Sequence, residues 1–204
     1  MYEAYDQFNK AKASCKSCPV GQAYGKVVLS CGQVHSPAVM VIGECPGADE
    51  IIHGEPFVGR SGKLLRDVLN RNGFRKENTL ITNTMPCRPQ DNVYPSDRTV
   101  VDACTSRWLW EEVRITRPRF ILIVGGKALM TVMGLGGIMS RRGVWMQLDR
   151  DGWNYRAKCM ATLHPSYVLR AQNMENAAEA MGAFEADIRE VALEAGLDTV
   201  PVVE

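Results

Sequence analysis

The stretch from Gly43 to Gly62 restricts most strongly what this chain can fold into. An apolar run at 38–42 precedes it, and the apolar spacing of residues 63–69 after it is typical of a helix. The stretch itself holds five glycines and two prolines, which let the backbone approach a ligand closely without regular hydrogen bonding. Because α/β proteins place ligands beyond the carboxyl ends of strands, we interpret 43–62 as a ligand-binding loop. The alternative is an ordinary connection with solvated charges.

Short apolar runs and helical patterns alternate along the rest of the chain. The continuously apolar run 38–43 predicts a strand covered on both faces of a parallel sheet, 79–83 predicts a second strand, and 120–124 predicts a third, buried strand. Further strands are predicted at 145–148 and 156–163, and a short edge strand fits 26–29. Helices are predicted at 2–13, 61–72, 97–116 (with Ser96 as the N-cap), 127–134 and 175–195. We therefore expect a three-layer α/β/α sandwich with a central, mainly parallel, four-stranded sheet.

Length and charge exclude some classes of protein. A chain of 204 residues favours one domain over 1–204, with a frayed tail at 196–204. The net charge of +1 gives no global electrostatic argument for nucleic acid, so a DNA-binding face must come from local arrangement. No apolar run approaches about 18 residues, and no signal-peptide pattern occurs, so neither a membrane nor export is indicated. We expect a cytoplasmic monomer.

The predicted strands bring polar residues to one edge of the sheet. In a parallel sheet, the loops after residues 43, 83, 124 and 163 all lie at the carboxyl edge. These loops hold Glu44, Asn83, Lys127 and His164. Their convergence predicts a single active site at this edge.

The cysteines indicate a metal or cluster site. The chain has seven, an odd number that argues against a disulfide framework. Cys15 and Cys18 have CxxC spacing, and two distant thiolates, Cys87 and Cys104, complete a set of four. Such a set suits either zinc or an iron–sulfur cluster, and the spacing does not decide between them. The others, Cys31, Cys45 and Cys159, fit small buried apolar residues.

Several separated segments together resemble one family. The segment GECPGADEIIHGEPFVGRSGKLL resembles the first motif of the family-four uracil-DNA glycosylases, and HPSYVLR resembles their second motif. The CxxC pair, the segment NTMPCRP and Cys104 are similar to their four cluster ligands in order and approximate spacing. The resemblance spans residues 15–171. It implies a monofunctional DNA-repair glycosylase of base excision repair, which hydrolyses the N-glycosidic bond of deoxyuridine in single- or double-stranded DNA and leaves an abasic site.

The resemblance also implies a cofactor. It favours a structural 4Fe-4S cluster over zinc, with segment 1–35 contributing ligands. The implied ligands are Cys15, Cys18, Cys87 and Cys104.

Carried over by position, the resemblance assigns residues to a uracil pocket. Phe57 would stack on the flipped base, and the Asn83 amide would read its polar edge with a donor and an acceptor. Backbone amides near Glu44 and Cys45 would bind a base oxygen. Glu50 would lie beside C5 of the base, where a side chain excludes the methyl group of thymine.

The resemblance assigns the chemistry to three residues. His164 would lie near O2 of the base and stabilise the negative charge that develops as the glycosidic bond breaks. A water molecule would add to the sugar with assistance from the backbone, Glu44 or Glu50.

A base inside a duplex is unreachable, so such an enzyme must extrude it and brace the gap. The segment 167–170 suits that task with an apolar wedge and a cation. Candidate DNA contacts, some at helix starts, are Ser61, Lys63, Lys127, Arg141, Arg142, Ser166, Tyr167, Leu169 and Arg170. For the arginine pair, the alternative is a solvated loop.

Three departures from the family pattern concern substrate range and rate. Cys45 replaces the alanine of the common form GEAPG, Ile51 replaces an acidic residue, and CRPQDNVYP lacks an arginine often seen after asparagine. These departures motivate an alternative, a non-catalytic or weakly catalytic binder of uracil or a modified pyrimidine in DNA. The cysteines alone would also suit a small iron–sulfur redox protein, but that function leaves HPSYVLR and PFVG without a purpose.

Overall fold

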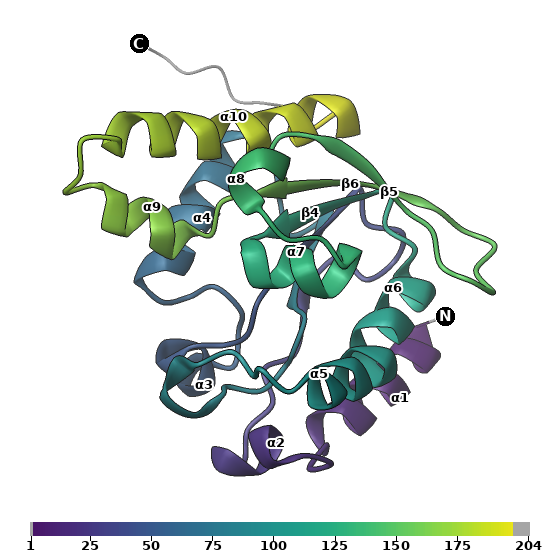
Figure 1. Cartoon of the computed structure of the whole chain (residues 1–204). Helices are drawn as coiled ribbons and strands as arrows, with labels where there is room; N and C mark the ends of the chain where they lie inside the picture. Colours follow the sequence, from purple (N-terminus) through teal and green to yellow (C-terminus); the bar gives the residue numbers. More distant parts are fainter. Residues whose placement is uncertain (1, 198–204) are drawn as a thin grey trace.

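A six-stranded sheet forms the centre of the structure, a computed structural model that describes residues 2–197 (Figure 1). The four central strands run parallel, and each edge strand pairs antiparallel with its neighbour. The order across the sheet is β1-β3-β2-β4-β6-β5. The strands are β1 (Cys31–Gly32), β2 (Val39–Gly43), β3 (Thr79–Asn83), β4 (Phe120–Val124), β5 (Trp145–Leu148) and β6 (Ala157–Thr162).

The mixed α/β class predicted from the sequence is confirmed, but the four-stranded sheet is wrong because two edge strands extend it to six. Strand β1 has two residues, which pair with Ile81 and Leu80, and so short a strand leaves no alternating pattern in the sequence. The edge strand fitted to 26–29 is instead an irregular segment in which Val27 forms an isolated bridge with Cys87.

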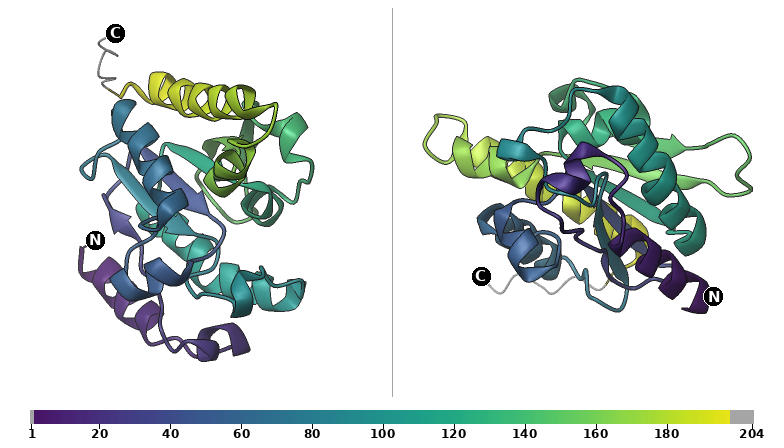
Figure 2. Two further views of the ribbon diagram at one scale, coloured as in Figure 1. Left: turned by 90° about the vertical axis from the view of Figure 1, so that its left-hand side faces the viewer. Right: turned by 90° about the horizontal axis from the view of Figure 1, so that it is seen from below.

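Helices cover both faces of the sheet, as Figure 2 shows from two further sides. One face packs against α4 (Arg60–Arg71), α9 (Pro165–Ala171) and α10 (Ala177–Ala195), and the other against α6 (Trp110–Thr116) and α7 (Gly126–Met133). Helix α1 (Tyr2–Ala13) lies outside the second layer, where Phe8 contacts Trp108. The remaining helices are α2 (Pro19–Ala23), α3 (Ala48–His53), α5 (Arg98–Cys104) and α8 (Ile138–Arg141).

The helix predicted at 97–116 is divided into three parts. A π-helical turn, Thr105–Leu109, separates α5 from α6, and a short 3-10 turn, Gln90–Asn92, precedes them. Asp97 caps α5 instead of Ser96, because its carboxylate accepts a hydrogen bond of 2.9 Å from the Thr99 N–H. Two helices that the sequence pattern did not indicate, α3 and α9, start inside the two motifs.

The strand register determines where the site forms. Gly43, the last residue of β2, pairs with Asn83, the last residue of β3. Val124 at the end of β4 pairs with Thr162 at the end of β6, two residues before His164. The carboxyl ends of all four parallel strands therefore meet at one edge, as the sequence predicted.

A buried polar network connects α1 with the sheet and α6. The Glu112 carboxylate accepts hydrogen bonds from Lys12 Nζ (2.9 Å), Tyr5 Oη (2.7 Å) and Thr82 Oγ1 (3.1 Å). The side chains of Lys12 and Glu112 are 2% and 0% exposed. Both charges are thus fully desolvated, and each depends on the other for compensation.

We expect Glu112→Gln to lower the free energy of unfolding by about 3–5 kcal/mol, because it leaves the buried Lys12 ammonium without an opposite charge. Urea denaturation measures the change. The neighbouring Glu111→Gln is the control: its partner Arg114 is 61% exposed, and the expected loss is about 0.5 kcal/mol. Equal losses in the two variants would contradict the importance of the buried pair.

Within residues 2–197, every helix is too short or too polar to cross a membrane. Gly196 ends α10 with a φ of 68°, and the rest of the tail predicted at 196–204, residues 198–204, lies outside the described residues.

Candidate functional site

A pocket of about 460 Å³ opens at the carboxyl edge of the parallel strands. It is lined by all six residues that the sequence analysis placed at the catalytic or base-binding positions: Glu44, Cys45, Glu50, Phe57, Asn83 and His164. The structure therefore brings together residues from the loop after β2, the end of β3 and the loop after β6. Their individual roles remain predictions.

Asn83 presents its side-chain amide to the pocket. The residue is 7% exposed, and within the described part of the chain its side-chain amide has no hydrogen-bond partner. The amide oxygen and the ring edge of Phe57 both lie against Gly43, where an added methyl group would overlap each of them. Because the amide lines the pocket, its donor and acceptor can bind a ligand with the complementary pattern.

Phe57 has an unusual backbone conformation. Its φ is 56°, in the left-handed region that a bulky side chain seldom adopts. The chain turns sharply here, and its backbone lies so close to Gly62 that a side chain at that position would overlap it. This turn directs the Phe57 ring to the pocket floor next to Gly43.

His164 caps the N-terminus of α9. The Ser166 N–H lies 3.2 Å from His164 Nδ1, and an N–H can only donate, so Nδ1 is the acceptor. The proton of the neutral ring is therefore on Nε2. Burial, followed by the positive charge of Arg170, lowers the pKa of His164 to about 4, although Glu50 opposes the shift. His164 is a neutral hydrogen-bond donor at physiological pH.

We expect an NMR titration to find His164 as the neutral Nε2–H tautomer from pH 8 down to about pH 5, because its pKa in the folded chain is about 4. Unfolding returns the pKa to about 6.5. The stability linked to His164 is therefore complete above about pH 6.5 and is lost as the pH falls toward 4. A ring that titrates near pH 6.5 in the folded protein would contradict this environment.

Glu44 lies next to His164. A Cβ built on Gly125 would be 2.6 Å from Glu44 Oε1 and 3.0 Å from His164 Cδ2, so both side chains cover this glycine. The Lys127 N–H donates to Glu44 Oε1 at 3.3 Å. Burial raises the pKa of the Glu44 carboxyl, while the Lys127 amide and the charges of Lys127 and Arg170 oppose the rise. A carboxyl group of this kind is suited to holding a water molecule.

Glu50 has a structural task within the loop. Its carboxylate accepts hydrogen bonds of 3.0 Å from the N–H groups of Gly47, Val58 and Gly59. Both oxygens are thus used to connect the two ends of the loop. The sequence does not indicate this arrangement. The roles predicted for Glu50 are exclusion of a methyl group beside the base and assistance to catalysis.

Cys45 lines the pocket as a neutral thiol. Burial, with the charges of Glu44 and Glu50, raises its pKa to about 12. The thiol therefore offers a soft, weakly polar wall to a ligand.

The predicted DNA contacts do not all lie together. Ser61, Ser166 and Arg170 line the pocket itself. Lys63 and Lys127 are exposed near the starts of α4 and α7, and Tyr167 and Leu169 lie on α9. Arg141 is exposed, with its Nε donating to the Gly136 carbonyl at 3.1 Å.

Arg142 differs from the other predicted contacts. Its Nε donates to Asp187 Oδ2 at 2.9 Å, and its Nη2 donates to the Ala183 carbonyl at 2.7 Å. Because the Asp187 side chain is 2% exposed, this pair fixes α10 against the sheet. The geometry favours a structural role for Arg142.

One polar lining residue was missed by the sequence analysis. Asn92 lines the pocket from the loop after β3, where Asp91 and Asn92 both have a positive φ, 54° and 56°. Asp and Asn tolerate this conformation better than other residues, so the dipeptide in a proline-containing loop was the available signal.

The four cysteines assigned as ligands come from three segments of the chain. Cys15, Cys18 and Cys104 line a second pocket of about 290 Å³. A Cβ built on Gly21 would lie 3.6 Å from Cys87 Sγ and 3.5 Å from the Cys15 carbonyl oxygen. Burial and then the nearby thiols of Cys18 and Cys15 raise the pKa of Cys87 to about 11.

These distances place the four cysteines near one another, but the cysteines do not form a coordination sphere. Among residues 2–197, no group of three or more His, Cys, Asp or Glu side chains is arranged to hold a metal ion. The donor set still fits an iron–sulfur cluster or zinc in its chemistry, because both accept four thiolates.

Comparison with known proteins agrees with the two motifs. The sequence profile described as the Uracil DNA glycosylase superfamily matches residues 30–188. The type-4 uracil-DNA glycosylase of Pyrobaculum aerophilum is 34% identical over 183 residues, which cover 86% of each chain. The type-4 enzyme of Archaeoglobus fulgidus is 33% identical, with 82% of this chain and 84% of the relative covered. That of Thermotoga maritima is 32% identical, covering 79% and 81%. The chain belongs to the uracil DNA glycosylase superfamily, in its type-4 group.

Proposed function

We propose that this protein is a DNA-repair enzyme that hydrolyses the N-glycosidic bond of deoxyuridine in DNA. The C1′–N1 bond breaks with its electron pair moving to N1 of uracil. The oxygen of a water molecule bonds to C1′, and a proton of that water neutralises the released base. One observation supports this function most directly: the free amide of Asn83, the ring of Phe57 and the neutral imidazole of His164 line one pocket.

Recognition of the base depends on the two side chains that lie against Gly43, Phe57 and Asn83. The Phe57 ring offers a flat apolar surface that any pyrimidine can share. The Asn83 amide adds polar recognition, because its donor and acceptor match the O4 and N3–H of uracil. A substrate without this pattern would leave the buried amide unpaired.

His164 would act on the leaving group. Its Nε2–H can donate to O2 of uracil, where negative charge grows as the bond to the sugar breaks. The Ser166 N–H donates to Nδ1 of His164, so the single proton of the neutral ring stays on Nε2. Glu44 would orient the attacking water, and Glu50 would keep the loop in shape.

DNA would approach the carboxyl edge of the sheet. The base must leave the helical stack to reach the pocket, and α9 supplies the residues that can replace it. The contacts we assign to this face are Ser61, Lys63, Lys127, Arg141, Ser166, Tyr167, Leu169 and Arg170. We further propose that the enzyme acts as a single-domain monomer in the cytoplasm.

We propose that Cys15, Cys18, Cys87 and Cys104 hold a 4Fe-4S cluster. These cysteines would hold the cluster from three segments of the chain, and its contribution there would be structural cross-linking. Burial acts to raise the pKa of the Cys15 thiol, but hydrogen bonds from Ser17 and Trp108 and the charge of Arg107 outweigh burial and lower this pKa. Iron and sulfide analysis of the purified protein tests the assignment, and four thiolates loaded with zinc alone would contradict it.

The function is tested with oligonucleotides that carry one uracil, single- and double-stranded, followed by alkaline cleavage of abasic sites. We expect strand cleavage at the uracil position and none with thymine at that position. Absence of cleavage beside an active reference enzyme would reject the glycosylase. Tight, uracil-dependent binding without cleavage would then support the alternative of a non-catalytic binder. The thiol of Cys45 in the pocket is the reason to consider this alternative.

A further inference from the structure

Arg66 has no role in the sequence motifs, yet it holds the loop that carries Phe57. Its Nε donates to the Phe57 carbonyl at 2.9 Å, and its Nη2 donates to the Pro56 carbonyl at 2.7 Å. Both are charge-assisted hydrogen bonds, and the planar guanidinium orients two successive carbonyl groups at once.

These bonds act where the backbone most needs them. Phe57 has a φ of 56°, a conformation that is unfavourable for a bulky residue and persists only when surrounding structure enforces it. The absence of a side chain at Gly62 permits the turn but provides no bond that holds it. Glu50 holds the following residue through the Val58 N–H, and Arg66 holds the Phe57 carbonyl and the one before it. Loss of the Arg66 bonds would let the loop relax and would turn the Phe57 ring away from Gly43.

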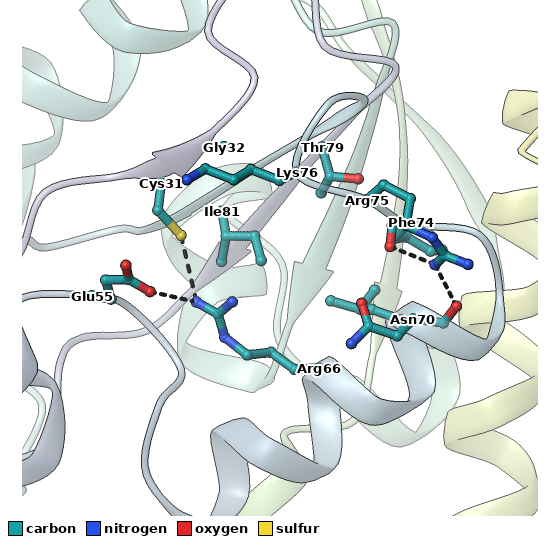
Figure 3. A pocket seen from close by; sticks show the side chains of 11 residues that line it. Cys31, Gly32, Glu55, Arg66, Asn70, Phe74, Arg75, Lys76, Thr79 and Ile81 are labelled. Carbon is teal, nitrogen blue, oxygen red and sulfur yellow. Dashed lines mark hydrogen bonds and ion pairs between the residues drawn. The ribbon is translucent and has the colours of Figure 1, made fainter.

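The other partners of Arg66 are weaker. Glu55 lies 3.7 Å from Nη2, and its side chain is 57% exposed, so this ion pair is worth little. Cys31 Sγ lies 3.5 Å from the same nitrogen, and burial raises the pKa of that thiol, which keeps it neutral. Figure 3 shows Arg66 reaching from α4 across a pocket toward these two residues.

We infer that Arg66 is a positioning residue for base recognition: it fixes the Phe57 ring in the orientation that stacks on uracil. The inference rests on the proposed function and adds a residue outside the base pocket to it. Because a stacked base is held in both the ground state and the transition state, Arg66 acts on substrate affinity more than on the rate of bond cleavage.

The pocket beside Arg66 gives this role a specific test. It has a volume of about 190 Å³ and opens to solvent between α4 and the edge of the sheet. Truncation of Arg66 would enlarge this space and leave two carbonyl groups without donors. A small guanidinium ion can enter the space and replace the lost donors.

The experiment compares wild type, Arg66→Ala and the control Arg71→Ala, whose arginine on the same helix pairs with the exposed Glu185. The measurement is the ratio of affinities for DNA with a non-hydrolysable 2′-fluorinated deoxyuridine and for undamaged DNA. We expect Arg66→Ala to lower this ratio about tenfold, as loss of base stacking does. The KM for uracil-containing DNA should rise while kcat changes less.

Methylguanidinium at millimolar concentration should restore the ratio in Arg66→Ala and should not alter Arg71→Ala. Should Arg66→Ala fail to fold, the comparison uses Arg66→Lys, which keeps one charged donor and should lose about threefold. A variant that folds and discriminates as wild type does, or a loss confined to kcat, would overturn the inference. If wild type itself does not cleave uracil-containing DNA, the proposed function fails instead, so the two failures are distinguishable.

Discussion

Gly43→Ala will lower kcat/KM for uracil-containing DNA by about 100-fold or more, because it displaces both walls of the base pocket by the order of 1 Å. The added methyl group would overlap the ring edge of Phe57 and the amide oxygen of Asn83. The backbone cannot move aside, since β2 is hydrogen-bonded to β3 on one side and β4 on the other. Kinetics with a single-uracil oligonucleotide measure the loss.

The control for Gly43→Ala is Gly182→Ala. Gly182 lies within α10 and has no heavy atom within 4 Å of an added Cβ. This change should leave kcat/KM unaltered and raise the free energy of unfolding by about 0.4–1 kcal/mol. If Gly43→Ala retained kcat/KM within a few-fold of wild type, the base would not bind between Phe57 and Asn83.

His164→Ala will reduce kcat by about 10²–10³, the usual effect of removing one donor from a developing negative charge. KM should change little, because the hydrogen bond to O2 strengthens only as the glycosidic bond breaks. This pattern is the opposite of the one expected for Arg66→Ala. Single-turnover kinetics separate the two effects, since they isolate bond cleavage from product release.

His53→Ala is the matched control for His164→Ala. His53 is an exposed residue of α3, and its Nδ1 lies 2.7 Å from the Asp49 carbonyl oxygen. We expect wild-type kcat for this variant. An unchanged kcat in His164→Ala would remove His164 from the chemistry and would leave Glu44 as the residue to examine next.

The central strands could be predicted from the sequence to within a residue or two. All residues of β2 and β4 are buried, so each strand appears as a short apolar run with sharp ends. The convergence of Asn83 and His164 follows from this, because parallel strands must present their carboxyl ends at one edge. The motifs then indicated which of the converging residues would face a base.

The rest of the site depends on contacts between distant segments. Arg142 is paired with Asp187, which is 45 residues away on α10, and the glycine-rich sequence around Arg142 gives no sign of that partner. The Glu50 carboxylate accepts hydrogen bonds from the N–H groups of Val58 and Gly59, and these bonds exist only because the folded loop brings the three residues together. Such pairings are tertiary, and no local pattern of residue types encodes them.

The buried pair of Lys12 and Glu112 also has a consequence for the order of folding. The two residues are 100 positions apart, so the contact closes a long loop before it gives any stability in return. During synthesis, the first helix therefore leaves the ribosome long before the segment that must receive it. Since Thr82 next to Asn83 shares the Glu112 carboxylate, the end of β3 acquires its final surroundings only when the two ends of this loop have met.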